Sequence, residues 1–239
     1  RSAEFVRKIY PTSLAHPRGK IFPLPESERF AGPWSRFWAS YSNAVNFAFG
    51  NRLFLSLMMK RVLDEVLFEA EFPLLWDAGH NIITREDIAG ETHYLHRKGA
   101  TPALGMEAMQ DTEFACYGQP VLIPGSMGAP SFILAGRGNH GSLSSASHGA
   151  ARSMSRGAAQ RVDDTLFREF LESFRVITPI DPNRADVKGR RDILEKWESE
   201  LREEAPCAYK AIGPVIDTQV DAGLVRPVAE LAPILTVKG

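Results

Sequence analysis

The sequence predicts an α+β protein with mixed sheets and packed helices, and three observations lead to this fold class. Apolar residues recur at helical spacing from Pro33 to Ala70. After Ala70 the chain changes to short apolar runs separated by Gly, Pro, Asn and Asp, as in strands joined by turns. Two amphipathic helical patterns then follow, at residues 163–174 and 191–203. Because no repeat or low-complexity tract interrupts the mixture, a repeat array is excluded.

Length and composition indicate a soluble globular domain. The chain has 239 residues, of which 44% are hydrophobic, so it can bury a sizeable core, and one domain is the default expectation. Its 28 Lys and Arg balance 29 Asp and Glu, which leaves a formal net charge of −1. The chain therefore lacks a global basic field, and any contact with a nucleic acid has to be local.

The cysteines, the longest apolar stretch and the first residues of the chain bear on where the protein is located in the cell. Cys116 and Cys207 are far apart and have no partner motif, which argues against disulfides and zinc and favours a reducing cytoplasm. The most apolar stretch, residues 33–70, is interrupted by many polar and charged residues, so we expect no membrane role. Residues 1–5 lack an initiator Met and any targeting pattern, and we expect the chain to be incomplete at its N-terminus.

The first part of the chain predicts a loop followed by helix. Residues 1–32 are rich in proline and turn residues, and they are expected to form a loop-rich lead-in. Residues 33–70 form the helical block, which should kink or break at Gly50-Asn51. The pair Met58-Met59 on this block is interpreted as core filling.

Residues 71–239 form the α+β part and carry the polar motifs. Strands are predicted at residues 92–96, 120–124 and 131–135, with a final strand region at 226–238. Helices are predicted at residues 163–174, 191–203 and 212–222, the last one stopped by Gly223. The charged segment 181–189 is expected to be a loop.

Candidate chemistry concentrates in four short segments, at residues 77–81, 96–101, 124–128 and 147–152. Each of them joins side chains able to bind a metal or a phosphate to a small, flexible backbone. Phosphate sites are commonly built in this way.

His148 is the strongest candidate for a nucleophile. It follows a stretch poor in packing residues and precedes a helix-compatible run that ends at Ser155-Arg156. An imidazole just before a helix start, with Arg152 and Arg156 one turn apart, can attack a phosphoryl centre while the charge is held. Alternatively, His148 is a hydrogen-bonded loop histidine and the arginines are a solvated pair. Spacing alone leaves both interpretations open.

Three other positions are weaker candidates on spacing alone. His80 could be a metal ligand, but no second histidine stands at i+4 or a similar spacing. If the strand persists, Arg97 and Lys98 lie on opposite faces, and Lys98 beside Gly99 is the better candidate for a phosphate contact. Residues 125–128 could cradle a phosphate through their amides, yet they lack the Walker spacing and predict a turn first.

Seven motifs in this order resemble the RtcB family of RNA ligases. They are Asn46–Arg52, His80-Asn81, His96–Thr101, Gly118–Gly128, His148–Arg152 with Ser155-Arg156, Glu204–Lys210 and the terminal Lys238-Gly239. The resemblance runs from about Tyr41 to the last residue. It implies an RtcB-like fold, with residues 1–239 forming the C-terminal part of a single catalytic domain.

The resemblance also implies an activity. RtcB ligases use GTP and manganese to join an RNA 3′-phosphate or 2′,3′-cyclic phosphate to a 5′-hydroxyl, in tRNA splicing and RNA repair. A histidine first accepts GMP from GTP, and GMP then passes to the RNA 3′-phosphate before the 5′-hydroxyl displaces it. The implied partners are RNA ends and GTP, and many family members also use an activating protein called archease.

Site residues follow from the resemblance by position. His148 would be the catalytic nucleophile and His80 a manganese ligand. Guanine contacts would come from Ser131, Tyr209 and Lys238. The nucleotide would be lined by Ser126, Ala150 and Ala151, whereas phosphates of GTP or RNA would be held by Lys98, Arg152 and Arg156.

The sequence also departs from the family pattern. Ala151 replaces a usual Gly, Phe132 and Pro102 replace a frequent Tyr and Arg, and residues 181–201 form a longer charged insertion. Family members are about twice as long, and the Asp, Cys and two metal-binding histidines of their N-terminal half have no counterpart here. This chain alone is therefore expected to bind manganese poorly and to catalyse slowly or not at all. Two alternatives therefore stay open: a noncatalytic nucleotide- or RNA-binding relative, and a phosphoryl-transfer or hydrolytic enzyme that uses His148 on another substrate.

Overall fold

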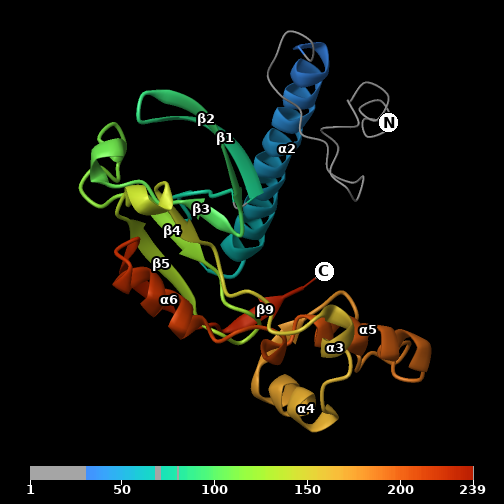
Figure 1. Cartoon of the computed structure of the whole chain (residues 1–239). Helices are drawn as coiled ribbons and strands as arrows, with labels where there is room; N and C mark the ends of the chain where they lie inside the picture. The colour runs from blue at the N-terminus through green and yellow to red at the C-terminus, as the bar shows by residue number, and fades with distance from the viewer. Residues whose placement is uncertain (1–30, 68–70, 80, 239) are drawn as a thin grey trace, which may run out of the picture. The chain divides into compact units, whose positions relative to one another are not determined.

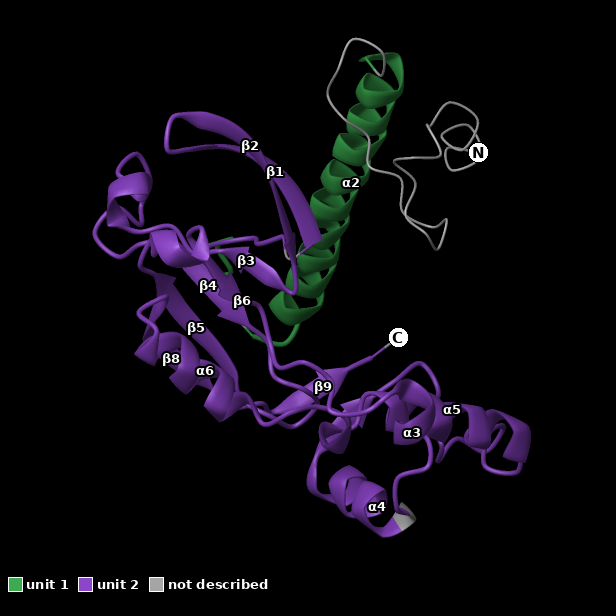
Figure 2. Cartoon of the chain, in the orientation of Figure 1, with its two compact units in different colours: residues 1–75 green, residues 76–239 purple. Residues whose placement is uncertain are grey.

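The computed structural model describes residues 31–67, 71–79 and 81–238. The predicted lead-in at residues 1–32 therefore lies almost wholly outside the described residues. The chain divides into two compact units, residues 1–75 and 76–239 (Figure 2). The first of these contains the predicted helical block, and the second contains the predicted strands and later helices.

The first unit contains the long helix α2, Ala31–Asp64. It runs through Gly50 and Asn51 without a break, since one glycine costs a helix only about 1 kcal/mol. No residue of α2 is buried, and Met58 and Met59 are 45% and 59% exposed, so within this unit they do not fill the core that the sequence predicts. A helix with apolar side chains needs packing partners, and residues 31–67 and 71–75 supply none that bury it. None of the described helices combines the length and the apolarity of a membrane span.

The second unit is built from small sheets and short helices (Figure 1). Strands β1 (Asn81–Ile88) and β2 (Glu91–Lys98) form an antiparallel hairpin, and β3 (Ala100–Pro102) pairs antiparallel with β6 (Ser145–Ser147). Strand β7 (Arg175–Ile177) runs parallel to β9 (Leu235–Val237). Short 3₁₀ turns occupy Met106–Met109, His140–Ser142 and Pro206–Ala208. This mixture confirms the predicted α+β class.

The larger core lies between a three-stranded sheet and a helix. The sheet has the order β4 (Pro120–Ile123), β5 (Ser131–Gly136) and β8 (Val225–Leu231), and α6 (Ile212–Asp221) packs against it. Leu134 at the centre is fully buried, and Ile216 of α6 is buried beside it. The register of the β5–β8 pairing shifts between Ile133 and Leu134, and Leu134 lies opposite Pro227. Because proline cannot donate a backbone hydrogen bond, it is accommodated in an edge strand with a bulge such as β8.

A second, smaller core holds the helical part of this unit. It joins α4 (Asp164–Ser173), α5 (Arg191–Glu203) and β7, while the short helix α3 (Arg156–Ala159) precedes them. Phe167 and Leu201 are buried at its centre, and Trp197 packs against them. The predicted helices at residues 163–174 and 191–203 are confirmed, because both place apolar residues three and four apart on one face.

Arg97 and Lys98 lie on opposite faces of β2, as predicted, and the charged side chain of Arg97 is the one that is buried. Lys98 is exposed, whereas the Arg97 side chain is only 2% exposed. Arg97 donates to Thr84 and to both carboxylate oxygens of Glu86, and it also donates to Ser145 and to the Leu143 carbonyl. These bonds tie the β1–β2 hairpin to the segment that leads into β6.

Gly136 shows how closely the main chain packs around the larger core. A Cβ at this position would lie 2.4 Å from the Ala103 carbonyl carbon and 2.6 Å from its oxygen. We expect Gly136→Ala to lower the free energy of unfolding by about 2–3 kcal/mol, since neither backbone can move aside without strain. Urea unfolding followed by circular dichroism measures this, with Gly213→Ala in α6 as the matched control. A Cβ at Gly213 meets nothing within 4 Å, so an equal loss in both variants would contradict the expectation.

Candidate functional site

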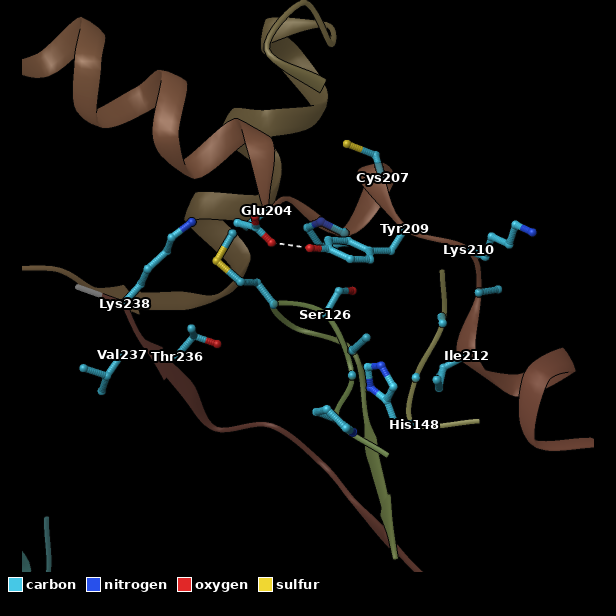
Figure 3. A pocket seen from close by; sticks show the side chains of 18 residues that line it. Ser126, His148, Glu204, Cys207, Tyr209, Lys210, Ile212, Thr236, Val237 and Lys238 are labelled. Atoms are coloured by element: carbon cyan, nitrogen blue, oxygen red, sulfur yellow. Dashed lines mark hydrogen bonds between the residues drawn. The ribbon is translucent and has the colours of Figure 1, made fainter. Parts of the chain in front are cut away.

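A pocket of about 800 Å³ opens between the two cores of the second unit (Figure 3). Four stretches of chain line it, at residues 124–129, 148–150, 204–212 and 236–238. The third of these runs from Ala205 in the smaller core to Ile212 in the larger one. Because both ends are anchored in packed cores, the residues between them are held in place.

The segment 124–129 reaches the pocket as a tight turn. The Ala129 amide donates to the Ser126 carbonyl at 2.9 Å, and Gly128 between them has φ +75°, which favours glycine. The Gly125 amide donates to the Ser131 hydroxyl at 3.0 Å. The turn predicted at residues 125–128 is therefore confirmed, and it leaves the Ser126 side chain on the pocket wall (Figure 3).

His148 follows directly after β6 and is half-buried in the pocket wall. Its backbone amide donates to the Gly99 carbonyl at 3.4 Å. The amide of the preceding Ser147 donates at 2.7 Å to the side chain of Gln219, which is buried on α6. Strand pairing and the larger core thus fix the main chain on which the imidazole stands.

The expectation of a helix start directly after His148 is wrong. Residues 151–153 instead pair with residues 208–210: the Lys210 amide donates to the Ala151 carbonyl, and the Ser153 amide donates to the Ala208 carbonyl. Helix α3 begins only at Arg156, and Arg152 lies outside it. The two arginines are therefore not a helical pair, because residues 151–153 form backbone hydrogen bonds with residues 208–210 and not within a helix.

Tyr209 is held in the pocket wall by two charged residues. Its hydroxyl donates to the Glu204 carboxylate, and Arg152 Nη1 donates to the same hydroxyl at 3.2 Å. Burial raises the pKa of Tyr209, and the hydrogen bond to Glu204 and its charge raise it further, whereas Arg152 lowers it. The phenol is thus a neutral, oriented group at ordinary pH.

Lys238 closes the opposite wall of the pocket (Figure 3). Its backbone amide donates to the Ile177 carbonyl at 2.8 Å, which continues the β7–β9 pairing. Its ammonium donates to the Glu200 carbonyl at 3.2 Å, near the C-terminal end of α5, where a positive charge is favourable.

The structure brings together five of the eleven residues predicted for the site. His148, Ser126, Ala150, Tyr209 and Lys238 all line the pocket. Five other predicted residues do not line it: Ser131, Ala151, Lys98, Arg152 and Arg156. His80, the predicted metal ligand, lies outside the described residues.

The five residues away from the pocket are engaged elsewhere or exposed. Ser131 supports the turn at Gly125, and Ala151 pairs with Lys210. Lys98 is exposed at the end of β2. The Arg156 side chain is 71% exposed and lies 3.4 Å from Glu203.

Sequence reasoning assigned no role to several other residues of the wall. Glu204 and Lys210 were recognised only as the ends of one motif, and Met127 only as part of a turn. Glu204, Lys210 and Met127 lie inside these motifs or at their ends, and that position is the signal that could have identified them. No spacing rule, however, shows which motif residue faces a cavity. Cys207, which also lines the pocket, is a free thiol, as is Cys116.

The described residues do not assemble a metal centre by themselves. Among residues 31–67, 71–79 and 81–238, no three side chains of His, Cys, Asp or Glu gather in a group that could hold a metal ion. Protein sites for transition metals usually need at least three such ligands. The donor set present in the described part of the chain thus does not fit a complete manganese site.

Comparison with known proteins gives one family. The family model described as tRNA-splicing ligase RtcB matches residues 31–239. The chain is 34% identical over 211 residues to the RNA-splicing ligase RtcB of Mycobacterium tuberculosis, with 85% of this chain and 45% of that protein covered. It is 32% identical over 233 residues to the tRNA-splicing ligase RtcB of Pyrococcus abyssi, with 91% and 24% covered. The chain thus spans less than half of the length of these relatives.

Proposed function

Since the chain belongs to the RtcB family of tRNA-splicing ligases, we propose that its pocket binds GTP and serves RNA ligation through His148. The substrates would be RNA 3′-phosphate or 2′,3′-cyclic phosphate ends and 5′-hydroxyl ends. One observation carries the proposal: the pocket gathers an imidazole, a serine hydroxyl, a phenol and a lysine from stretches of chain far apart in the sequence. A cavity of about 800 Å³ is in the range used for nucleotide-sized ligands.

His148 would act as the nucleophile. An imidazole nitrogen attacks the α-phosphorus of GTP, a P–N bond forms, the P–O bond to the leaving group breaks, and pyrophosphate departs with the electron pair. An oxygen of the RNA 3′-phosphate then attacks the same phosphorus and releases the imidazole. Finally the 5′-hydroxyl attacks the activated RNA phosphate, loses its proton and expels GMP. A 2′,3′-cyclic end would first be opened by water to the 3′-phosphate.

The remaining residues would bind and orient the nucleotide. Tyr209 and Lys238 stand on the walls around the turn that carries Ser126, and the backbone at Ala150 adjoins His148, so base and phosphates can occupy opposite ends of one cavity. Ser131 would act through the turn that it supports, and Ala151 through its pairing with Lys210.

Two cationic residues outside the pocket, Lys98 and Arg156, would bind the RNA through their exposed side chains. Arg152, which was also expected to hold a phosphate, instead uses its donors on Tyr209 and on two backbone carbonyls. Exposed Lys and Arg attract phosphates through charge and make the affinity depend on salt. Archease would be a further partner of the ligase.

Manganese is the metal that the family implies. When bound, it would supply Lewis acidity at the phosphates, with His80 as one ligand. The described residues do not complete its ligand set, so the groups that this chain is proposed to supply are the side chains that line the pocket.

The experiment that tests the proposal follows GTP labelled at the α-phosphate or at the γ-phosphate, incubated with Mn²⁺ and either this chain or a form extended by an N-terminal half like that of the relatives. In the extended form we expect an acid-labile protein adduct that carries the α-label and not the γ-label, with release of pyrophosphate. This chain alone should form the adduct slowly or not at all, because its described residues do not complete the metal site. Nucleotide binding without an adduct would identify instead a noncatalytic nucleotide-binding relative. An adduct that carries the γ-label, or release of inorganic phosphate, would indicate a different phosphoryl transfer or hydrolysis. Absence of both binding and adduct would contradict the proposal.

A further inference from the structure

The hydroxyl of Tyr209 has almost no freedom of its own. It donates its proton to the Glu204 carboxylate, shown as the dashed line in Figure 3, and it accepts a hydrogen bond from Arg152 at 3.2 Å. The guanidinium carbon of Arg152 also lies 5.0 Å from the centre of the phenol ring. One edge and one face of the ring are therefore occupied by these two residues.

Arg152 is itself anchored by the main chain. Its Nη2 donates to the Glu203 carbonyl at 2.5 Å, and its Nε donates to the Met154 carbonyl at 3.2 Å. Its Nη1 lies 3.5 Å from Glu204 Oε1, so the charges of the pair offset each other. The guanidinium thus cannot swing away from the phenol without losing several bonds, which keeps the arrangement of Tyr209, Glu204 and Arg152 rigid.

A phenol hydroxyl has one proton and two lone pairs. Here Glu204 takes the proton and Arg152 takes one lone pair, which leaves a single lone pair for anything else. Toward a ligand, Tyr209 can therefore only accept a hydrogen bond. A ligand edge that presents another acceptor at this point would face an unpaired lone pair.

We propose that Glu204 is a positioning residue for base specificity: it fixes Tyr209 as an acceptor toward the pocket and so favours a purine edge that donates there. Guanine presents two adjacent donors on this edge, N1–H and the 2-amino group, whereas adenine presents one donor, the 6-amino group, beside the acceptor N1. This inference rests on the proposed binding of a nucleotide in the pocket and adds the residue that selects the base. Sites built to pair a polar group discriminate strongly against a ligand that leaves the group unpaired.

The test measures dissociation constants for GTP and ATP in the wild-type chain and in Glu204→Gln, Tyr209→Phe and the double variant. Glutamine keeps the shape of glutamate but offers a donor as well as an acceptor, so the hydroxyl proton is no longer fixed. We expect Glu204→Gln to reduce the preference for GTP over ATP about tenfold, as the loss of one oriented hydrogen bond does. In the Tyr209→Phe background the same substitution should change the preference less than about twofold, because Glu204 acts only through the hydroxyl.

The adjacent Glu203 provides the matched control. Its carboxylate accepts from Gln160 at 2.7 Å and lies 3.4 Å from Arg156, and no contact with Tyr209 involves it. Glu203→Gln should leave the nucleotide preference unchanged. An unchanged preference in Glu204→Gln would overturn the proposal, as would an equal loss with and without the Tyr209 hydroxyl.

A second readout separates this inference from the proposed function. NMR titration of ring-labelled tyrosine, assigned with Tyr209→Phe, should show a lower Tyr209 pKa in Glu204→Gln, since Glu204 raises it. If the pKa responds and nucleotides bind with the expected coupling, the proposal is supported. If nucleotides bind but the pKa does not respond, the role of Glu204 is overturned while the proposed function stands. If the pKa responds and no nucleotide binds, the proposed function fails, and the specificity role fails with it.

Discussion

Replacing His148 by alanine in the N-terminally extended form should abolish its labelling by α-labelled GTP, with a fall in adduct formation of at least about a thousandfold. The reason is that the nucleophile makes the bond to phosphorus, and no other described side chain in the pocket wall is a histidine. GTP affinity should change little, because the other walls of the pocket remain. Filter assays of the adduct and equilibrium binding measured side by side separate these two effects.

His140 offers the matched control for this experiment. It is an exposed histidine in the turn His140–Ser142, and it does not line the pocket. His140→Ala should label like the wild type. Ser126→Ala, which removes a hydroxyl from the pocket wall, should reduce labelling by about tenfold or less, as the loss of one hydrogen bond does. An undiminished adduct in His148→Ala would place the reactive group elsewhere and sink the proposed mechanism.

Local patterns predict the longer helices and the strands β2, β4, β5 and β8, because the causes of these elements are local, but they do not predict β1, β3, β6 and β7. The helix at Arg191–Glu203 was predicted with the observed bounds, since Leu194, Trp197 and Leu201 recur at helical spacing. Strand pairing had no such local cause. The partner of β5 on one side is β8, about ninety residues later, and the bulge opposite Pro227 depends on that pairing. The exposure of Met58 could not be predicted for the same reason, because an apolar helical pattern does not show which other element packs against the helix.

The residues of the candidate site likewise fall into those that local motifs identify and those whose contacts depend on tertiary pairing. Short motifs identified His148, Ser126 and Tyr209, because reactive or polar residues beside glycine and alanine stand out in a sequence. They did not identify what Arg152 does. Its donors are used by Tyr209 and by the Glu203 and Met154 carbonyls, which follows from the pairing of residues 151–153 with 208–210. A motif gives the residue type at a position, whereas tertiary pairing decides where its hydrogen bonds go.

The largest loss of stability is expected for Arg97→Met. The substitution removes a charge that is 2% exposed and leaves the carboxylate of Glu86, which is 28% exposed, without its partner. Breaking a buried ion pair from one side typically costs about 3–5 kcal/mol. Arg85→Met, on an exposed position of β1, is the control and should change the free energy of unfolding by less than about 0.5 kcal/mol. Equal effects of the two substitutions in urea unfolding would show that the bonds of Arg97 contribute nothing.

The cause can be separated from lost packing in two ways. Arg97→Met combined with Glu86→Leu should recover part of the loss, because the unpaired carboxylate is then gone.

The pH dependence of the free energy of unfolding gives the second way. Burial raises the pKa of Glu86, but hydrogen bonds from Arg97 and Thr84 and the charge of Arg97 outweigh it, so the pKa is lowered on folding. The stability that this carboxylate contributes is therefore present above its pKa in the unfolded chain and is lost as the pH falls through its lower folded pKa. Arg97→Met should remove this acid-sensitive part, so the difference in unfolding free energy between wild type and variant should shrink as the pH is lowered across that range. A difference that stays constant with pH would assign the loss to packing rather than to the ion pair.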